Sequence, residues 1–335
     1  MTARAKALFG VAASVLLLWW VLRDVSLTAV ARELRGVRPG LFLLAVTLAT
    51  AGFAVRAARW RVLLLPFAPD VPFRPRFAAT TLGFAANNLL PARVGELVRA
   101  HSLARLSCAS TAGALASLAV ERLLDGLVLA CFLFAVMAAP AFPASRMAGV
   151  HPWLGGLLVL SLSAALLLGF VLVALRPQAL LRLAGGVFRR MLPEKARAAV
   201  SGFALAFVEG LSVLRDPRLF ALSLLWALFQ WAFLALSYLA AFRAFGIEVG
   251  YTGAVFLQSL VSLAVSIPSS PGFFGPFEAA ARVGLELYGV PGEKAVSFAV
   301  GFHLGGFVPV TLIGLYYLGR TGLGWRELGA GESRG

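Results

Sequence analysis

Six long runs of apolar residues, separated by short segments rich in arginine, dominate this sequence. They lie at about 7–22, 41–55, 112–139, 153–175, 219–242 and 295–318. A helix needs about 20 apolar residues to cross a bilayer, so the first two runs must borrow flanking residues. Only 13% of the chain is charged, compared with about 25% in soluble domains. The sequence therefore predicts an all-α polytopic membrane protein with about six full spans, in a single membrane domain over residues 1–335.

Two further apolar stretches, 77–90 and 251–267, are shorter than a full span. The first runs into Pro91 and the second into Pro268. Broken backbone of this kind is tolerated at membrane depth only where protein or a water-filled cavity surrounds it. We expect two re-entrant segments that enter the membrane and return to the same side.

The distribution of lysine and arginine tests this expectation, because cytoplasmic loops carry an excess of both. If both short stretches are re-entrant, the side that holds the two termini has 21 of these residues and the opposite side has 8. If both cross fully, the numbers become 12 and 17. The re-entrant arrangement is favoured, with both termini in the cytoplasm. Residues 176–218 are then cytoplasmic amphipathic helices lying on the leaflet, and 321–335 are a disordered cytoplasmic tail.

The two halves of the chain resemble each other weakly at an offset near 178 residues. Pro39 matches Pro217 at the start of a span, and Phe73 matches Tyr251 at the start of each short segment. We interpret residues 1–139 and 140–320 as two half-repeats of opposite orientation. Broken segments at matching places in an inverted repeat indicate a transporter with a substrate site near the midplane.

Polar residues concentrate between positions 87 and 99. Pro91 biases Leu90 away from helix, and Gly95 and Glu96 begin a new helix whose amide end favours anions. Arginine forks suit phosphate. An alternative is a simple hairpin cap whose arginines snorkel to the interface. The residues expected to contact a lipid headgroup here are Asn87, Asn88, Arg93, Glu96 and Arg99.

Three ionisable residues lie within the third long run. Glu121 and Asp125, four residues apart, share one helix face, and Arg122 lies between them. Ionisable residues at this depth usually face the bundle interior in pairs. We expect Arg122 to contact the headgroup and Glu121, Asp125 and His303 to balance charge or couple a proton. The alternatives are a structural ion-pair cluster and, for His303, a hydrogen-bonded packing residue.

The second break, residues 268–278, is rich in proline, glycine and serine. Its glycines permit close approach of the backbone. We expect Ser269, Ser270 and Glu278 to contact the headgroup, although a rigid extracellular turn with Glu278 as a helix cap is an alternative. The residues expected to set the geometry of the two hairpins are Pro91, Gly95, Pro268, Pro271, Gly272 and Gly275.

No motif in the sequence indicates a cofactor, a metal site or a nucleotide. The two cysteines, Cys108 and Cys131, lie in apolar surroundings without the spacing of a disulfide or a metal site. The net charge of +15 could suggest nucleic acid, but the arginines lie between apolar runs. Anchoring to anionic lipid explains them better, and nucleic-acid binding is not expected.

Three segments together resemble the flippase-like membrane family, the transmembrane region of lysylphosphatidylglycerol synthases (multiple peptide resistance factor). The segments are 88–96 (NLLPARVGE), 121–125 (ERLLD) and 268–278 (PSSPGFFGPFE). The resemblance runs from about residue 41 to residue 318. The second break departs from the family, because Ser269, Ser270, Phe273 and Phe274 stand where relatives have a more glycine-rich turn.

The resemblance implies a bacterial or archaeal inner-membrane protein that moves lipids between leaflets. Its partners would be membrane lipids with anionic or lipid-linked headgroups, and its relatives are linked to hopanoid or polyprenyl-lipid pathways. The chain ends at Gly335 without the large soluble domain that aminoacylates phosphatidylglycerol in full synthases. Synthase activity is therefore not expected.

A lipid flippase is the leading hypothesis, and two alternatives remain. An intramembrane lipid-modifying or glycolipid-pathway enzyme would use Glu121 and Asp125 as acid and base. A membrane scaffold would dock a separate soluble enzyme on the basic segment 176–218.

Overall fold

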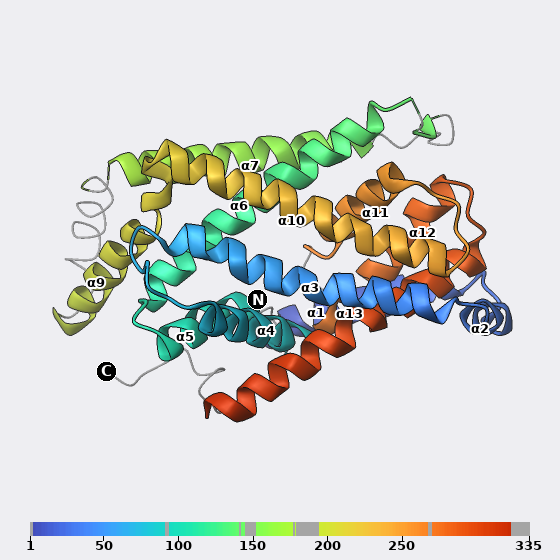
Figure 1. Cartoon of the computed structure of the whole chain (residues 1–335), viewed down its shortest axis with the longest axis horizontal. Helices are drawn as coiled ribbons and strands as arrows, with labels where there is room; N and C mark the ends of the chain where they lie inside the picture. The colour runs from blue at the N-terminus through green and yellow to red at the C-terminus, as the bar shows by residue number, and fades with distance from the viewer. Residues whose placement is uncertain are drawn as a thin grey trace.

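A computed structural model describes residues 3–90, 94–140, 142–144, 152–176, 178, 194–266 and 270–322. Every regular element in these ranges is a helix, and the chain is an all-α, multi-pass membrane protein. Figure 1 shows long helices along the longest axis and shorter helices toward both ends. Pro91, Arg93, Pro268 and Ser269, together with the predicted tail from residue 323 onward, lie outside the described residues.

Each of the six predicted spans corresponds to a helix of at least 20 residues. The helices are α1 (Ala3–Leu22), α3 (Pro39–Leu64), α6 (Thr111–Met137), α7 (Pro152–Leu175), α10 (Pro217–Ala244) and α13 (Gly292–Thr321). Twenty helical residues extend about 30 Å, the thickness of the hydrocarbon core. By length and composition, α3, α10 and α13 qualify as spans, and the bent pair of α1 and α2 (Leu27–Arg35) can count as a fourth. The number six stays a prediction.

The centre of the bundle is the pair α3 and α10, which pack side by side along their length. The amide of Arg38, just before α3, donates to the carbonyl of Ala244, the last residue of α10, at 3.0 Å. The start of one helix therefore meets the end of the other, and the two run antiparallel (Figure 1).

Two helical hairpins flank this pair. Hairpin 1 consists of α4 (Phe73–Leu89) and α5 (Gly95–Leu106), and hairpin 2 of α11 (Tyr251–Ala264), the 3-10 turn η4 (Pro271–Phe273) and α12 (Pro276–Leu287). α4 ends because Leu90, which precedes a proline, adopts an extended conformation. The hairpins lie toward opposite ends of the long helices in Figure 1.

Each hairpin packs against the last long helix of the other half of the chain. α4 lies against α13, where Gly314 approaches the backbone of Thr81 and the side chain of Ala85. In the same way, α11 lies against α6. This exchange places the broken ends of both hairpins next to the middle of the bundle.

The second predicted span was too short. The apolar run at 41–55 suggested that the helix ends before Arg56, but α3 continues to Leu64 and includes Arg56 and Arg59. Both arginines are buried inside the bundle, since they form ion pairs with acids of α6. Arg76 and Arg99, which were also counted as cytoplasmic charges, are buried as well. Even when these four arginines are left out, the side that holds the two termini has more lysine and arginine than the opposite side.

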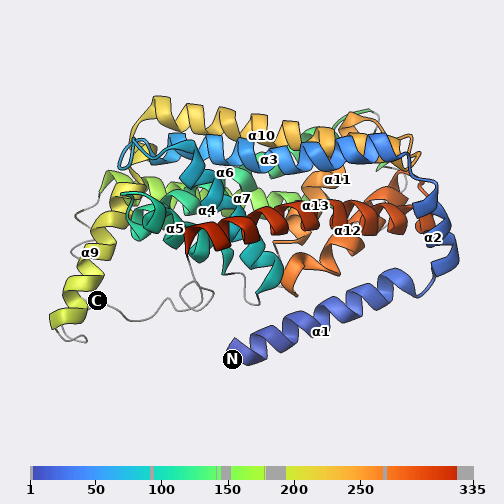
Figure 2. The ribbon, with the colours of Figure 1, turned by 60° about the horizontal axis from the view of Figure 1, so that its bottom comes forward.

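The first helix stands apart from the bundle. Figure 2 shows α1 diverging from the other helices toward its N-terminus, while α2 turns back along the end of the bundle. α1 packs against α12, and the hydroxyl of Ser14 accepts a hydrogen bond from the amide of Ser270 at 3.0 Å. The axes of the second half of α1 and of α2 differ by 83°. α1 is thereby tied to hairpin 2.

Part of the predicted amphipathic segment 176–218 is described. It contains α9 (Glu194–Gly210) and the 3-10 turn η3 (Ser212–Arg215). α9 projects from one end of the bundle in Figure 2, and its Phe203 and Leu205 are exposed. The position of α9 relative to a leaflet stays a prediction.

Hairpin 1 depends on a close contact between two glycines. A Cβ atom on Gly83 would lie 2.7 Å from the carbonyl oxygen of Gly95 and 2.9 Å from Cβ of Arg99. We expect Gly83→Ala to lower the free energy of unfolding by about 1–3 kcal/mol, because α4 and α5 must separate. Gly319→Ala is the matched control, since a Cβ there meets no atom within 4 Å. Thermal unfolding of both purified variants tests this, and equal stability would contradict it.

Candidate functional site

A cavity of about 610 Å³ lies between the two hairpins. Its lining comes from α3, α4, α5 and α6 of the first half and from α10, α11, α12 and α13 of the second. Much of the wall is aromatic and aliphatic, so that the polar groups are few and define its chemistry. The polar and charged residues of the wall are Arg56, Asn87, Asn88, Glu96, Arg122, Asp125, Gln230, Tyr238, Ser262, Ser266 and His303.

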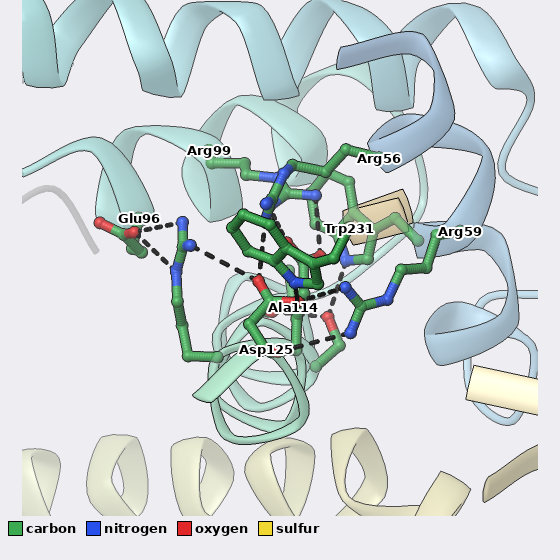
Figure 3. Close-up of polar contacts among 11 residues, drawn as sticks. Arg56, Arg59, Glu96, Arg99, Ala114, Asp125 and Trp231 are labelled. Carbon is green, nitrogen blue, oxygen red and sulfur yellow. Dashed lines mark hydrogen bonds and ion pairs between the residues drawn. The ribbon is translucent and has the colours of Figure 1, made fainter. Parts of the chain in front are cut away.

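One wall of the cavity is backed by a buried set of ion pairs, shown in Figure 3. Arg56 donates to Glu121 at 2.6 Å and to Asp125 at 3.1 Å. Arg99 donates hydrogen bonds to both carboxylate oxygens of Glu121, at 2.8 and 3.0 Å. Arg59 donates to the other oxygen of Asp125. We call these five residues, together with Arg122 and Glu96, the ion cluster.

The i, i+4 spacing on α6 explains why the two acids meet the same arginines. Residues four apart lie one above the other on a helix face, so Glu121 and Asp125 both point at α3. Arg56 and Arg59 are three apart on α3 and form the facing pair. Charges buried at this depth must be paired, and the cluster therefore joins α3, α5 and α6.

Aromatic side chains close the cluster. The guanidinium of Arg99 lies 4.0 Å from the ring centre of Trp60, and that of Arg56 lies 5.7 Å from the ring centre of Trp231. The indole nitrogen of Trp231 donates to Asp125 at 2.9 Å. Such cation–π contacts are worth about 2 kcal/mol when water is excluded. Trp231 thus connects α10 to the same network.

Arg122 extends the cluster into the cavity. Its guanidinium donates twice to Glu96 of α5, at 2.7 and 3.1 Å, and lies 3.7 Å from Asp125. The side chains of Arg122 and Glu96 are 41% and 34% exposed, whereas that of Glu121 is 0% exposed. Arg122 and Glu96 are therefore the members of the cluster that a bound molecule can reach most easily.

The opposite wall contains a second acid–base pair. Nδ1 of His303 lies 2.6 Å from Oε1 of Glu278, and Nε2 lies 2.9 Å from the carbonyl oxygen of Gly272. The other carboxylate oxygen of Glu278 accepts from the amide of Gly275 at 2.7 Å. Phe277 stacks on the imidazole with ring centres 4.2 Å apart. These contacts connect η4, α12 and α13.

The two asparagines organise the break of hairpin 1. The side-chain oxygen of Asn87 accepts from the amide of Gly95 at 2.8 Å, which joins the end of α4 to the start of α5. Asn88 donates to the hydroxyl of Thr311 on α13 at 2.7 Å. Both asparagines also line the cavity, so they hold the tip of the hairpin beside it.

The predicted site residues divide into three groups. Asn87, Asn88, Glu96, Arg122, Asp125 and His303 line the cavity. Arg99, Glu121 and Glu278 are buried directly behind its wall. Ser270, Pro271, Gly272 and Gly275 belong to the turn of hairpin 2, where Gly272 and Gly275 have positive φ angles of 70° and 99°. For the residues of all three groups, contact with a lipid headgroup stays a prediction.

Sequence reasoning missed Arg56, Arg59, Trp60 and Trp231. The two arginines were taken as the cytoplasmic flank of a span. A signal was present, since Glu121 and Asp125 needed more positive charge at depth than Arg122 supplies. Trp231 carried no local signal, because an indole in an apolar helix is ordinary. Among the described residues, no group of three or more His, Cys, Asp or Glu side chains could hold a metal ion.

Comparison with known families identifies the chain. The family model described as "Lysylphosphatidylglycerol synthase TM region" matches residues 7–314. The chain therefore belongs to this family. A search of curated proteins found no match.

The ion cluster makes a stability prediction. Glu121→Gln leaves Arg56 and Arg99 buried without their shared carboxylate, and we expect it to lower the free energy of unfolding by about 3–5 kcal/mol. Glu33→Gln is the control, because the one ion pair of Glu33 among the described residues is a partly exposed pair with Lys294 at 3.7 Å, and surface pairs contribute about 0–1 kcal/mol. Unfolding curves of the purified proteins measure both. Similar stability of the two variants would refute a structural role for Glu121.

Proposed function

We propose that this member of the family moves a lipid with an anionic, phosphate-bearing headgroup between the two leaflets. The observation that carries the proposal is the cavity between the hairpins, because the ion cluster at one of its walls has four arginines and three carboxylates. The headgroup would occupy the cavity between the hairpin tips while the acyl chains stay in the bilayer.

The charge of the ion cluster supports an anionic ligand. Its four arginines, Arg56, Arg59, Arg99 and Arg122, face three carboxylates, Glu96, Glu121 and Asp125. One positive charge is left over within the cluster. Phosphate supplies the missing negative charge, and guanidinium groups bind it through paired hydrogen bonds. Arg56 and Arg122 reach the cavity and are the residues we assign to this contact.

The order of the helices supports an inverted repeat. α3 and α10 begin 178 residues apart, as do α4 and α11. α5 and α12 begin 181 residues apart, as do α6 and α13. The antiparallel pairing of α3 with α10 agrees with opposite orientations of the halves 1–139 and 140–320. In transporters built this way, one half rocks against the other around a fixed site.

The contacts of the acids favour transport over intramembrane catalysis. Glu121 has both oxygens on guanidinium groups and is not part of the cavity wall. Asp125 accepts from Arg56, Arg59 and Trp231. A general acid or base must reach the proton that it transfers, and these carboxylates are already engaged. A scaffold that docks a soluble enzyme stays a second candidate without a contact that favours it.

Transport can be measured in liposomes that contain the purified protein and a fluorescent phospholipid. We expect faster exchange between leaflets for phosphatidylglycerol, which is anionic, than for phosphatidylcholine, which is zwitterionic. Arg122→Gln should slow the anionic lipid about 10–100-fold, since hydrogen bonds to charged groups contribute about 1.5–3 kcal/mol. Arg320→Gln, at the exposed end of α13, should have no effect. A folded protein that moves neither lipid would contradict the proposal.

The proposed orientation has both termini in the cytoplasm of a bacterial or archaeal inner membrane. Cys108, between α5 and α6, is exposed and would lie on the cytoplasmic side. In a Cys131→Ser background, a membrane-impermeant maleimide should label Cys108 only after the cells are permeabilised. The denatured protein gives the full extent of labelling as a control. Labelling of intact cells would place hairpin 1 on the outer side and reverse the orientation.

A further inference from the structure

The two acid–base pairs of the cavity occupy equivalent places in the two halves. Arg122 is the twelfth residue of α6, and His303 is the twelfth residue of α13. Their partners, Glu96 and Glu278, lie in the first turn of α5 and of α12. Each pair therefore fastens the second helix of a hairpin to the long helix that follows it. We call Arg122–Glu96 latch 1 and His303–Glu278 latch 2.

The hydrogen-bond partners of His303 and Glu278 determine how many protons latch 2 holds. The carbonyl oxygen of Gly272 can only accept, so Nε2 of His303 must carry a hydrogen. Oε1 of Glu278 and Nδ1 lie 2.6 Å apart and need one proton between them. Oε2 of Glu278 already accepts from the amide of Gly275. The closed latch thus holds one shared proton, whichever of the two groups carries it.

Without this proton, the closed geometry is unfavourable. The lone pair of Nδ1 would face the carboxylate of Glu278, and the two would repel each other. Latch 1 has no such dependence, because the guanidinium of Arg122 stays protonated throughout the physiological range. Imidazole is the side chain whose unperturbed charge changes in that range. Latch 2 can therefore open and close with a change of pH in this range, whereas latch 1 does not respond to it.

We propose that a single proton shared by His303 and Glu278 holds hairpin 2 closed against α13, and that hairpin 2 opens when this proton leaves to water. Latch 1 keeps hairpin 1 fastened independently of pH. The link to lipid movement rests on the proposed function, whereas the latch itself does not.

The surroundings of His303 contain no other ionised group in direct contact among the described residues. Phe274, Phe277 and Phe307 pack around the ring. On α12, Arg282 pairs with Glu286, and at the start of α13 Lys294 pairs with Glu33 of α2. The ionisable and polar groups that share the cavity with His303 from α3, α4, α5, α6 and α10 are Arg56, Asn87, Asn88, Glu96, Arg122, Asp125, Gln230 and Tyr238.

Both pairs are formed, but the two latches differ in their exposure to water. The side chains of His303 and Glu278 are 8% and 3% exposed, far less than those of latch 1. Latch 2 is therefore shielded from water, while water can reach the pair of latch 1. Opening hairpin 2 would expose the cavity toward the opposite end of the bundle.

The proposal sets the pH dependence of opening. Closed, the latch holds the shared proton, whereas the separated imidazole and carboxylate have given it up to water. Opening then releases one proton, and its equilibrium constant rises about tenfold per pH unit. Closure is complete at lower pH and is lost as pH rises.

Two alanines provide a matched pair of reporters. Ala281 of α12 and Ala100 of α5 are both 0% exposed and lie on the same helices as Glu278 and Glu96. The experiment uses Ala281→Cys or Ala100→Cys in the full chain with Cys108→Ser and Cys131→Ser. Each rate of labelling by a water-soluble maleimide is divided by the rate of the denatured protein at the same pH. This ratio removes the ionisation of the thiol itself.

The ratio for Ala281→Cys should rise about tenfold per pH unit between pH 7 and 9, as expected when opening releases one proton, until opening is complete. The ratio for Ala100→Cys should stay constant. Glu278→Gln should abolish the rise, because its amide can accept from Gly275 and donate to the neutral imidazole, which keeps the latch closed without a shared proton.

Three outcomes would overturn the latch. These are a constant ratio for Ala281→Cys, an equal rise after Glu278→Gln, and an equal rise for Ala100→Cys, which would indicate general unfolding. The measurement needs no lipid movement. A failed transport assay with a rising ratio would reject the proposed function alone, whereas active transport with a constant ratio would reject the latch alone.

Discussion

A charge inside an apolar bundle is unfavourable by several kcal/mol unless an opposite charge meets it, and this constraint determines how the centre of the molecule is assembled. Glu121 and Asp125 sit in the middle of α6 and are buried. They require arginines from outside their own helix, and α3 and α5 provide them. The ion pairs thereby hold α3, α5 and α6 in one arrangement, and α10 joins through the indole of Trp231.

The half-length hairpins follow from a related constraint on the backbone. A helix that stops inside the membrane leaves amides without partners, and each must be satisfied within the protein. In hairpin 1 the side chain of Asn87 accepts from Gly95, and in hairpin 2 that of Glu278 accepts from Gly275. The side chains that satisfy these amides stand beside the cavity. The polar groups beside the cavity are thus a direct consequence of breaking the helices there.

Local signals were sufficient to predict the helices and the breaks. Apolar runs of span length and the proline after Leu90 depend on neighbouring residues alone, and the structure has helices and a break at those places. The ion cluster depends on pairs that are 65 and 66 residues apart. Nothing near Arg56 or Arg59 distinguishes a buried arginine from one that flanks a span. Arg99 was assigned to a headgroup for the same reason, although both of its terminal nitrogens bind Glu121.

The difference between the two latches follows from their burial. Latch 1 is exposed to the cavity, so water can solvate Arg122 and Glu96, and a permanent ion pair is tolerated there. Latch 2 is almost fully buried, and separating two ions there would expose each to a poorly solvating interior. A histidine avoids this, since the shared proton can leave to water as the pair parts, so that the imidazole becomes neutral and only the carboxylate keeps its charge. An arginine at position 303 could not release a proton in this way, because its guanidinium group stays protonated. Equivalent positions in the two halves therefore require different side chains, because latch 1 is in contact with water and latch 2 gives up its shared proton when it opens.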